Sequence, residues 1–517
     1  MTMEMHKIKI SHSPLLATFI VSLSASLLIV FLATNGSFDL FQPSFLWKAY
    51  NHYFLSLIDG RLDVPAYAIG KEGNFIDGKA YMYYGLLPTV TRLFIFPFAD
   101  LTQVPVAYFS VLFFTIIGNS VLQYSLISKH VAMQLAPTAG AQQTPSLSLL
   151  ILISSVIWIG SGSFIISQNA TIYHEPYAAS LCMVNLFLAL LVKHDFFIGA
   201  YRKVNLVPFA ILAGLCIHAR MPSALALYLV TGLLILVQTY RSQVCLSKII
   251  KIHKLLGLAL VQYWKAILIL GLFGLSILWL NYAKYGDALS FMGRNYGFMF
   301  FEGFSERMCN VLPQAEFYKF YRILVNTYVY LSGDWQNHWS LIRLFSTGYG
   351  RVELPAASLA LLWALPLITF IFLFFVFIKG FIQVENRILL LALLGFSAGA
   401  TFQLMYPTIT HRYVVTFWPP LLASILFCWF KYGSSISLKT KYIVITLGFV
   451  GMTYQLYLAV FDDYYVNDGP VTALELPTLH YSDEDSAYLG ALTKDKIKTF
   501  KIERSRIKRS ECEKWLN

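Results

Sequence analysis

Residues 15–33 read LLATFIVSLSASLLIVFLA, a run that contains no charged side chain. A run of about 20 apolar residues is long enough to cross the hydrocarbon core of a bilayer as a helix. Lipid offers no hydrogen-bond partners to the backbone, so the run must be helical to satisfy its own polar groups. We interpret it as an uncleaved membrane anchor, because it is longer than the apolar core of a typical signal peptide; a cleaved signal peptide is the alternative.

The same pattern recurs along the rest of the chain. Ten further stretches carry no Asp, Glu, Lys or Arg and can cross a membrane, the shortest of them only with its flanks: 104–128, 146–173, 176–192, 204–217, 221–240, 266–283, 354–378, 388–410, 413–430 and 442–461. The sequence therefore predicts an all-α polytopic membrane protein with about eleven transmembrane helices.

The composition of the 517 residues agrees with this class. Hydrophobic residues make up 57% of the chain and charged residues 13%, about half the charged share of a soluble domain. This excludes an ordinary soluble enzyme and a disordered chain. The 39 Lys and Arg exceed the 27 Asp and Glu by 12, which we attribute to the basic cytoplasmic loops of membrane proteins and not to nucleic-acid binding.

The short connections predict the orientation. With the N-terminus inside, sixteen Lys and Arg residues fall on the inner side, whereas the short outer loops hold only Arg220 and Arg412. Because short cytoplasmic loops are enriched in Lys and Arg, the N-terminus is predicted to be cytoplasmic. Residues 35–103, 284–353 and the tail 462–517 are then outside.

The chain thus divides into a membrane domain, residues 1–461, and a polar outer tail, residues 462–517. The first outer loop is predicted to carry an amphipathic surface helix over 45–58, because aromatic and aliphatic residues recur there at helical spacing. The apolar stretch 85–99 contains Arg92 and two prolines, so we interpret it as a segment at the membrane surface or re-entering it.

Charged residues at the outer mouths of the spans are candidate binding groups. Arg220 and Arg412 are arginines in short outer loops, and His411 precedes the second of them. A guanidinium group can bind a phosphate through a fork of N–H donors; the alternative is an arginine that extends to lipid headgroups or pairs with Glu175. His174 and Glu175 begin a predicted span, where the carboxylate is a candidate ligand, a base or a helix cap.

The long outer loops supply further candidates. Acids near the predicted surface helix of the first loop are Asp39, Asp59, Asp63, Glu72 and Asp77. A carboxylate at the edge of the membrane can act as a general base, and we give this role to Asp77 and Asp39, although Asp77-Gly78 is also a typical turn. Arg294, in the aromatic segment FMGRNYGFMFFEGF of the second loop, is a candidate for substrate binding. No carboxylate cluster with metal-ligand spacing is visible, so no metal is predicted.

Five segments resemble a known family. They read NHYFLSLIDGRLDVP from residue 51, DGKAYMYYGLLP from 77, AGLCIHARMPSAL from 213, NYAKYGDALSFMGRNY from 281 and HRYVVTFWPP from 411. Together with a first span, a large outer loop with a surface helix and many further spans, they resemble the glycosyltransferase C superfamily. Protein O-mannosyltransferases and aminoarabinose–lipid A transferases belong to this superfamily, and the segments are most similar to uncharacterised bacterial members.

The resemblance implies a function and a location. Such a protein would transfer a sugar from a polyprenyl-phosphate donor to a lipid, glycan or protein acceptor, at the outer face of the bacterial inner membrane. An acidic residue soon after the first span usually activates the acceptor in this superfamily. The surface helix here has no Asp-Glu pair and carries Asn51-His52 instead, so His52 joins Asp77 and Asp39 as a candidate catalytic residue.

Two other classes of protein remain open. One is a transporter or flippase of lipid-linked or small solutes, and the other is a non-catalytic membrane assembly protein. The leading prediction names membrane lipid and a lipid-linked sugar as partners, with no nucleic acid and no cofactor other than the donor substrate.

Overall fold

The computed structural model describes residues 2–69, 72–76, 79–135, 146–198, 204–244, 252–289, 320–332, 351–352, 358–380, 383–406, 408–409 and 411–461. Within them, nine helical segments are long and apolar enough to cross a membrane. They contain α1 (Thr2–Ala33), α5 (Ala107–Leu135), α6 (Leu147–Trp158) with α7 (Gly162–Ser167), α8 (His174–Lys193), α10 (Met221–Val244), α12 (Trp264–Tyr285), α18 (Val384–Leu404), η6 (His411–Phe417) with α19 (Trp418–Tyr432), and α20 (Leu438–Phe461). The chain is therefore an all-α polytopic membrane protein, as predicted.

Two shorter apolar helices, α9 (Val207–Ile217) and α17 (Ala364–Lys379), fall on the two other stretches predicted to span. The number of spans, eleven, stays a prediction. Apart from the helices of residues 48–95, which are described next, the other helices are η3 (Phe196–Ile198), α11 (Ile252–Gln262), α14 (Arg322–Ser332) and α16 (Leu359–Leu362).

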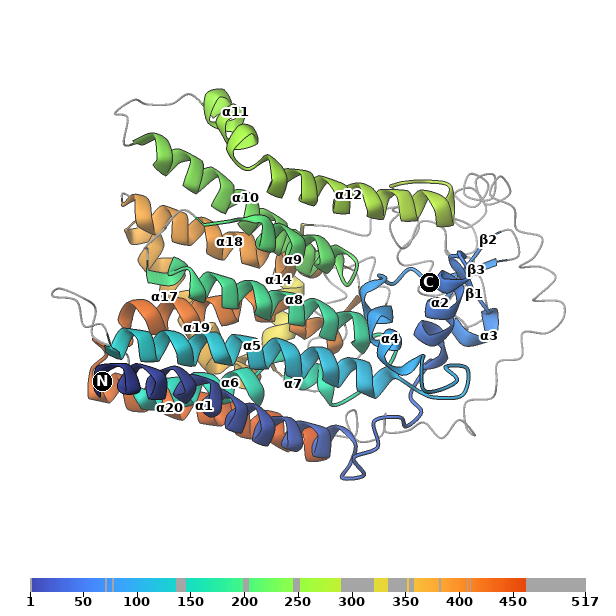
Figure 1. Ribbon diagram of the computed structural model, residues 1–517, viewed down its shortest axis with the longest axis horizontal. Helices are drawn as coiled ribbons and strands as arrows, with labels where there is room; N and C mark the ends of the chain where they lie inside the picture. Colours follow the sequence, from blue (N-terminus) through green and yellow to red (C-terminus); the bar gives the residue numbers. More distant parts are fainter. Residues whose placement is uncertain are drawn as a thin grey trace, which may run out of the picture.

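A small cap covers one end of the bundle. It consists of α2 (Lys48–Ile58), β1 (Asp63–Val64), α3 (Ala66–Ile69), β2 (Asn74–Ile76), β3 (Lys79–Tyr81), η2 (Leu87–Thr91) and α4 (Arg92–Ile95). The three strands form an antiparallel sheet in the order β1-β3-β2. Figure 1 shows the cap at the opposite end of the bundle from the N-terminus and α11. We call this end the cap end.

The surface helix of the first loop exists, but its apolar face packs on protein. Tyr50 and Tyr53 of α2 are fully buried, in one cluster with Ile69 and Met82 of the cap and Ile172 of the bundle. The stretch 85–99 contains two short helices and no span. Leu87 is buried, but Leu93, Phe94 and Phe98, the last 87% exposed, face outward, as expected of a segment at the membrane surface.

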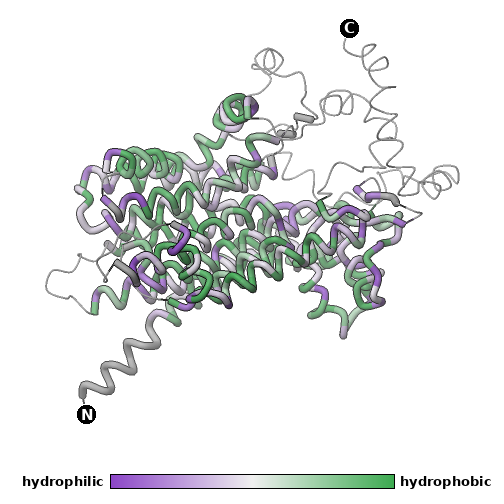
Figure 2. The backbone as a smooth tube through the Cα atoms, turned by 90° about the horizontal axis from the view of Figure 1, so that it is seen from above, coloured by the Kyte–Doolittle hydropathy of each residue, from purple (hydrophilic) through white to green (hydrophobic). Residues whose placement is uncertain are grey.

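The bundle is built around α8. This helix packs against α5 on one side and α9 on another, and 89% of its most apolar window is buried. The same fraction is 11% for α1 and 17% for α12, so these two helices present apolar side chains to lipid. Figure 2 shows that the middle of the bundle is mainly hydrophobic, with hydrophilic residues concentrated toward its ends.

Helix α14 caps the end of α18. Asn326 Nδ2 donates to the carbonyls of Leu404 at 2.7 Å and Tyr406 at 3.0 Å, and Arg322 donates to the Met405 carbonyl at 3.4 Å. The last carbonyls of a helix have no partner within it, so these donors satisfy the end of α18. After α18 the chain forms β5 (Thr408–Ile409), which pairs in parallel with β4 (Arg351–Val352).

Gly85 allows the cap to approach the α9–α10 connection closely. A Cβ on Gly85 would lie 1.9 Å from the carbonyl oxygen of His218, and that oxygen accepts a 2.8 Å hydrogen bond from Leu87 N–H. We expect Gly85→Ala to destabilise the protein by about 1–3 kcal/mol, because the backbones must separate. Gly232→Ala is the control, since nothing lies within 4 Å of its Cβ. Thermal unfolding of both variants tests this, and equal melting temperatures would contradict it.

Candidate functional site

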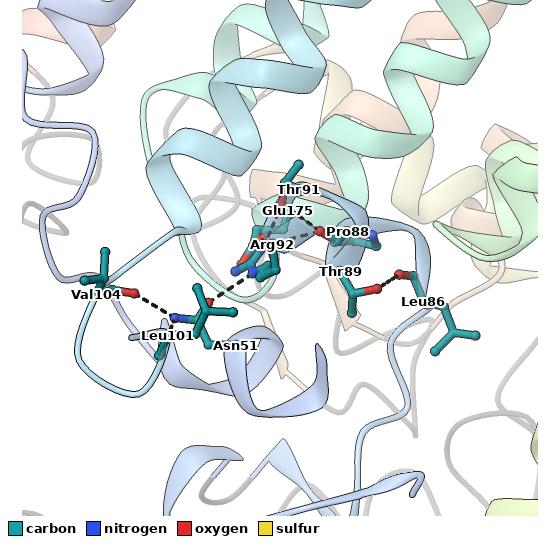
Figure 3. Close-up of polar contacts among 9 residues, drawn as sticks. All are labelled: Asn51, Leu86, Pro88, Thr89, Thr91, Arg92, Leu101, Val104 and Glu175. Atoms are coloured by element: carbon teal, nitrogen blue, oxygen red, sulfur yellow. Dashed lines mark hydrogen bonds and ion pairs between the residues drawn. The ribbon is translucent and has the colours of Figure 1, made fainter. Parts of the chain in front are cut away.

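A buried ion pair joins the cap to the bundle. Arg92 of α4 is 0% exposed, and its guanidinium forms a two-point contact with the carboxylate of Glu175 in the first turn of α8. Arg92 Nε also donates to Asn51 Oδ1 at 3.0 Å. Asn51 Nδ2 in turn donates to the carbonyls of Leu101 and Val104, both at 2.8 Å (Figure 3).

This network accounts for two residues that the sequence singled out. Glu175 was a candidate ligand, base or cap, or a partner of Arg220 or Arg412; the structure pairs it with Arg92. Both carboxylate oxygens bind the buried Arg92 guanidinium and Glu175 is itself 0% exposed, so no substrate can reach it and we do not include Glu175 in the candidate site. Asn51 lies where the resemblance led us to expect an acid, and its side chain binds Arg92.

The two arginines of the short loops come together with aromatic residues at the cap end. The Arg412 guanidinium carbon lies 4.0 Å from the ring centroid of Tyr173 and 5.5 Å from that of Tyr413. The Arg220 guanidinium carbon lies 3.5 Å from the ring of Tyr177 and 5.4 Å from the same Tyr413 ring. Both arginines are half-buried, and the ring faces attract their positive charge.

An acid of the first loop completes this group. Glu72 Oε1 accepts a hydrogen bond of 2.6 Å from the Tyr173 hydroxyl. Its Oε2 accepts from the hydroxyls of Tyr83 at 3.0 Å and Tyr84 at 3.3 Å. Burial raises the pKa of Tyr84 well above its ordinary value, which keeps this phenol protonated as a donor. We call this group the arginine–tyrosine cluster, and it consists of Glu72, Tyr83, Tyr84, Tyr173, Tyr177, Arg220, Arg412 and Tyr413.

Arg220 has unused hydrogen-bonding capacity. Within the described part of the chain, its one hydrogen bond runs from Nη2 to Gln403 Oε1 at 3.1 Å. Arg220 Nε and Gln403 Nε2 are both buried donors without a partner there. Gln403 stands in the last turn of α18, which Asn326 and Arg322 hold from α14. Two adjacent unpartnered donors favour an acceptor-rich ligand, such as a phosphate.

Of the other predicted site residues, His174 makes a local contact, and three lie wholly or with their side chain outside the described residues. His174 is buried, with Nδ1 2.7 Å from the Thr171 hydroxyl. The side chain of His411 and the whole of Asp77 and Arg294 lie outside the residues that the structure describes, so their roles stay predictions.

Asp39 and His52, two of the predicted catalytic residues, occupy structural positions. Asp39 is exposed, and its Oδ1 accepts a 2.8 Å hydrogen bond from the Phe41 N–H in a local turn. His52 is buried on α2, with Nε2 3.2 Å from the Tyr67 hydroxyl and the two rings edge to face. Neither contacts the arginine–tyrosine cluster through these bonds, and we do not include them in the candidate site.

The environment of His52 predicts a pH dependence. Burial, followed by the nearby Lys48 ammonium, lowers the pKa of His52 from 6.5, while Asp100 acts in the opposite direction. The unfolded chain then binds a proton more readily than the folded one, so stability falls as the pH drops through about 6.5. We expect the melting temperature of His52→Gln to decrease less than that of the wild type between about pH 7.5 and about pH 5.5. Equal decreases in the two proteins would contradict this.

No group of three or more His, Cys, Asp or Glu side chains that could hold a metal occurs among the described residues. No protein-family model, curated protein or solved structure matches the chain. The class that the fold defines is a multi-pass membrane protein. Any more specific function must be argued from the arginine–tyrosine cluster itself.

Proposed function

We propose that the protein is a membrane glycosyltransferase that moves a sugar from a polyprenyl-phosphate donor to a lipid, glycan or protein acceptor. The reaction takes place at the cap end, which faces outward when the N-terminus is cytoplasmic, in a bacterial inner membrane. The observation that carries the proposal is that two arginines and one carboxylate contact the same group of tyrosines, the arginines through the rings and the carboxylate through the hydroxyls. Arg412 and Arg220 both face Tyr413, and Arg412 also covers Tyr173, whose hydroxyl is bonded to Glu72.

In this proposal the arginines bind the phosphate of the donor. The prenyl chain stays in the lipid and its phosphate lies at the membrane edge, within reach of Arg220 and Arg412. When the bond between the sugar and the phosphate oxygen breaks, negative charge increases on the leaving phosphate. Guanidinium groups at that position stabilise the transition state more than the ground state, which is the condition for catalysis.

Glu72 acts as the general base. The acceptor hydroxyl transfers its proton to the Glu72 carboxylate while its oxygen forms a bond to the anomeric carbon of the sugar. The bond from that carbon to the phosphate oxygen breaks, and polyprenyl phosphate leaves with the electron pair. The tyrosine hydroxyls orient the carboxylate before the acceptor arrives. The neighbouring rings offer stacking surfaces for a sugar.

The position of the charges favours an enzyme over a transporter. In the nine candidate spans, every Asp, Glu, Lys and Arg lies in the first or last two turns of its segment. Transporters typically bind substrate and coupling ions near the middle of the membrane, with polar or charged groups there. The arginine–tyrosine cluster lies instead at one end of the bundle, where a lipid headgroup is accessible.

A complementation experiment tests the proposed function. A strain without the gene would receive the wild-type protein, Arg412→Ala or Arg61→Ala, all at equal levels in the membrane. Arg61 is the matched control, because it is a half-exposed arginine of the first outer loop whose ion pairs among the described residues are with Asp59 and Asp63. Surface glycans and lipids would be compared by mass spectrometry.

The proposal predicts that one glycan or lipid loses a single sugar in the deletion strain and with Arg412→Ala, and regains it with wild type and Arg61→Ala. An intact cargo that accumulates on the inner leaflet would support the transporter alternative. No change in any glycan or lipid would contradict the glycosyltransferase proposal.

A further inference from the structure

A buried lysine outside the arginine–tyrosine cluster has no acidic partner among the described residues. Lys284, in the last turn of α12, is 5% exposed. Its Nζ donates to the Met82 carbonyl at 2.8 Å and lies 4.9 Å from the ring centroid of Tyr53. No carboxylate forms an ion pair with it in the part of the chain that the structure describes. A buried ammonium group without an anion is costly, and two of its three N–H donors are unused.

Tyr53 adds a second unused donor beside it. The Tyr53 side chain is 0% exposed, and its hydroxyl makes no hydrogen bond within the described residues. Burial raises the pKa of Tyr53 well above its ordinary value, so the hydroxyl keeps its proton. A polar group buried without a partner is rare in folded proteins and calls for an unseen one. The Lys284 ammonium lies over the Tyr53 ring, and the phenol hydroxyl and the ammonium group of these two neighbouring side chains are each complementary to an oxygen anion.

His218 offers an acceptor close to these donors. Its Nε2 lies 2.8 Å from the Ser276 hydroxyl, which donates its own proton to the Phe273 carbonyl at 2.8 Å. Ser276 must therefore accept from Nε2–H, which leaves Nδ1 of the neutral ring as an acceptor. Nδ1 is buried without a partner among the described residues. Burial and the nearby Lys284 ammonium both lower the pKa of His218, which keeps the ring neutral. A ligand hydroxyl would satisfy this atom.

The group of Lys284, Tyr53 and His218 adjoins the arginine–tyrosine cluster, because both groups use residues of the same two short segments of chain. In the cap, Met82 contacts Lys284, whereas Tyr84 contacts Glu72. In the α9–α10 connection, His218 contacts α12, whereas Arg220 contacts Gln403 of α18. A transferase needs two substrates whose reacting atoms approach to about 3–3.5 Å. Two polar sites that share the segments 82–84 and 218–220 are neighbours, as two substrates of one reaction require.

We propose that Lys284 and Tyr53 bind an anionic oxygen group of the acceptor substrate, a phosphate or a carboxylate, and that His218 binds a hydroxyl next to it. The evidence for the site itself is that the Lys284 ammonium, the Tyr53 hydroxyl and His218 Nδ1 are buried with unused hydrogen-bonding capacity among the described residues. Its assignment to the acceptor rests on the proposed function. The proposal narrows the acceptor to an anionic, hydroxyl-bearing molecule, such as a phosphorylated or acidic glycan or glycolipid.

Inorganic phosphate provides the first test. Thermal unfolding of the purified full-length protein would be followed as phosphate increases at constant ionic strength. Tyr53→Phe is the most informative variant, because it removes only a hydroxyl that has no partner and leaves the Lys284–Met82 contact intact. We expect it to fold normally and to raise the phosphate concentration for half-maximal stabilisation about 10-fold, the effect of one lost hydrogen bond to an anion.

Lys284→Met and a lysine control complete this test. Lys284→Met should likewise need a higher phosphate concentration for half-maximal stabilisation. Lys265 is an exposed lysine at the other end of α12, and Lys265→Met should respond to phosphate as the wild type does. Unchanged phosphate responses in Tyr53→Phe and Lys284→Met would overturn the site. Arg412→Ala reports separately on the donor phosphate: if this variant keeps the full response while Tyr53→Phe and Lys284→Met lose it, the proposed function is contradicted and the Lys284 site stands.

A second arm distinguishes a lipid headgroup from a free anion. The protein would be placed in bilayer discs of phosphatidylcholine with or without phosphatidic acid, and bound lipid would be counted by native mass spectrometry. Phosphatidic acid retained by the wild type and lost in Tyr53→Phe would identify a lipid acceptor. Retention equal in both proteins, together with a phosphate response that depends on Tyr53, would support a water-soluble acceptor at the same site.

Discussion

Glu175→Gln is expected to destabilise the protein by about 3–5 kcal/mol, because it leaves the Arg92 guanidinium charged and buried without its counter-ion. Arg92 is 0% exposed and both oxygens of Glu175 bind it. Removal of one partner from a buried pair leaves the other charge desolvated, and the neutral acceptors that Arg92 keeps (Asn51 Oδ1, the Pro88 carbonyl and the Thr91 hydroxyl) carry no charge to replace the carboxylate. Arg92→Met should cost at least as much, since it also removes the bond to Asn51.

The double variant separates this pairing from a simple loss of packing. Arg92→Met with Glu175→Leu removes both charges, and replacement of a buried pair by apolar groups is often close to neutral. We therefore expect the double variant to be more stable than either single variant. Arg61→Met serves as the exposed control, with an expected cost of no more than about 1 kcal/mol. Thermal unfolding in one detergent compares the wild type with Arg92→Met, Glu175→Leu, the double variant and Arg61→Met, and additive single effects would contradict the pairing.

Glu72→Gln is expected to reduce sugar transfer at least about 100-fold, the contribution of a general base. The amide keeps an oxygen that can accept from Tyr173 but has no basic oxygen to take the acceptor proton. The melting temperature should fall only slightly, because Glu72 is half-buried, and the amide nitrogen in place of Oε2 can donate to the Tyr83 and Tyr84 hydroxyls once these rotate.

Asp39→Asn is the matched control for Glu72→Gln. It also removes one negative charge from the first loop, but Asp39 is exposed and its Oδ1 only accepts from the Phe41 N–H in a turn. The product per unit of protein, measured in the complemented strains, should stay at the wild-type level. A loss with Asp39→Asn and none with Glu72→Gln would contradict the assignment of the base.

The membrane part of the fold could be predicted from the sequence because each span carries its own signal. An uncharged run such as 15–33 must be a helix in lipid whatever surrounds it. In the cap the surface helix could be predicted, but the strands give no such signal. Strands such as Asp63–Val64 and Lys79–Tyr81 have two or three residues, too few for an alternating pattern to be recognised.

The site could be predicted in part. Arg220 and Arg412 stood out as exceptions to the charge rule for outer loops, and the structure brings both to Tyr413. The partner of Glu175 was missed, because Arg92 lies 83 residues away in the chain and such pairings are set by tertiary packing. Glu72 was one of several loop acids, and only the fold shows which of them meets the tyrosines.

Binding of the carrier lipid tests the central claim most directly. Purified wild-type protein and Arg412→Ala would be titrated with a labelled polyprenyl phosphate and with the corresponding polyprenol, which has the same chain and no phosphate. The account predicts that the wild type binds the phosphate form at least about 10-fold more tightly than the alcohol, and that Arg412→Ala loses most of this preference. Equal binding of the two lipids to the wild type, or an unchanged preference in Arg412→Ala, would contradict it.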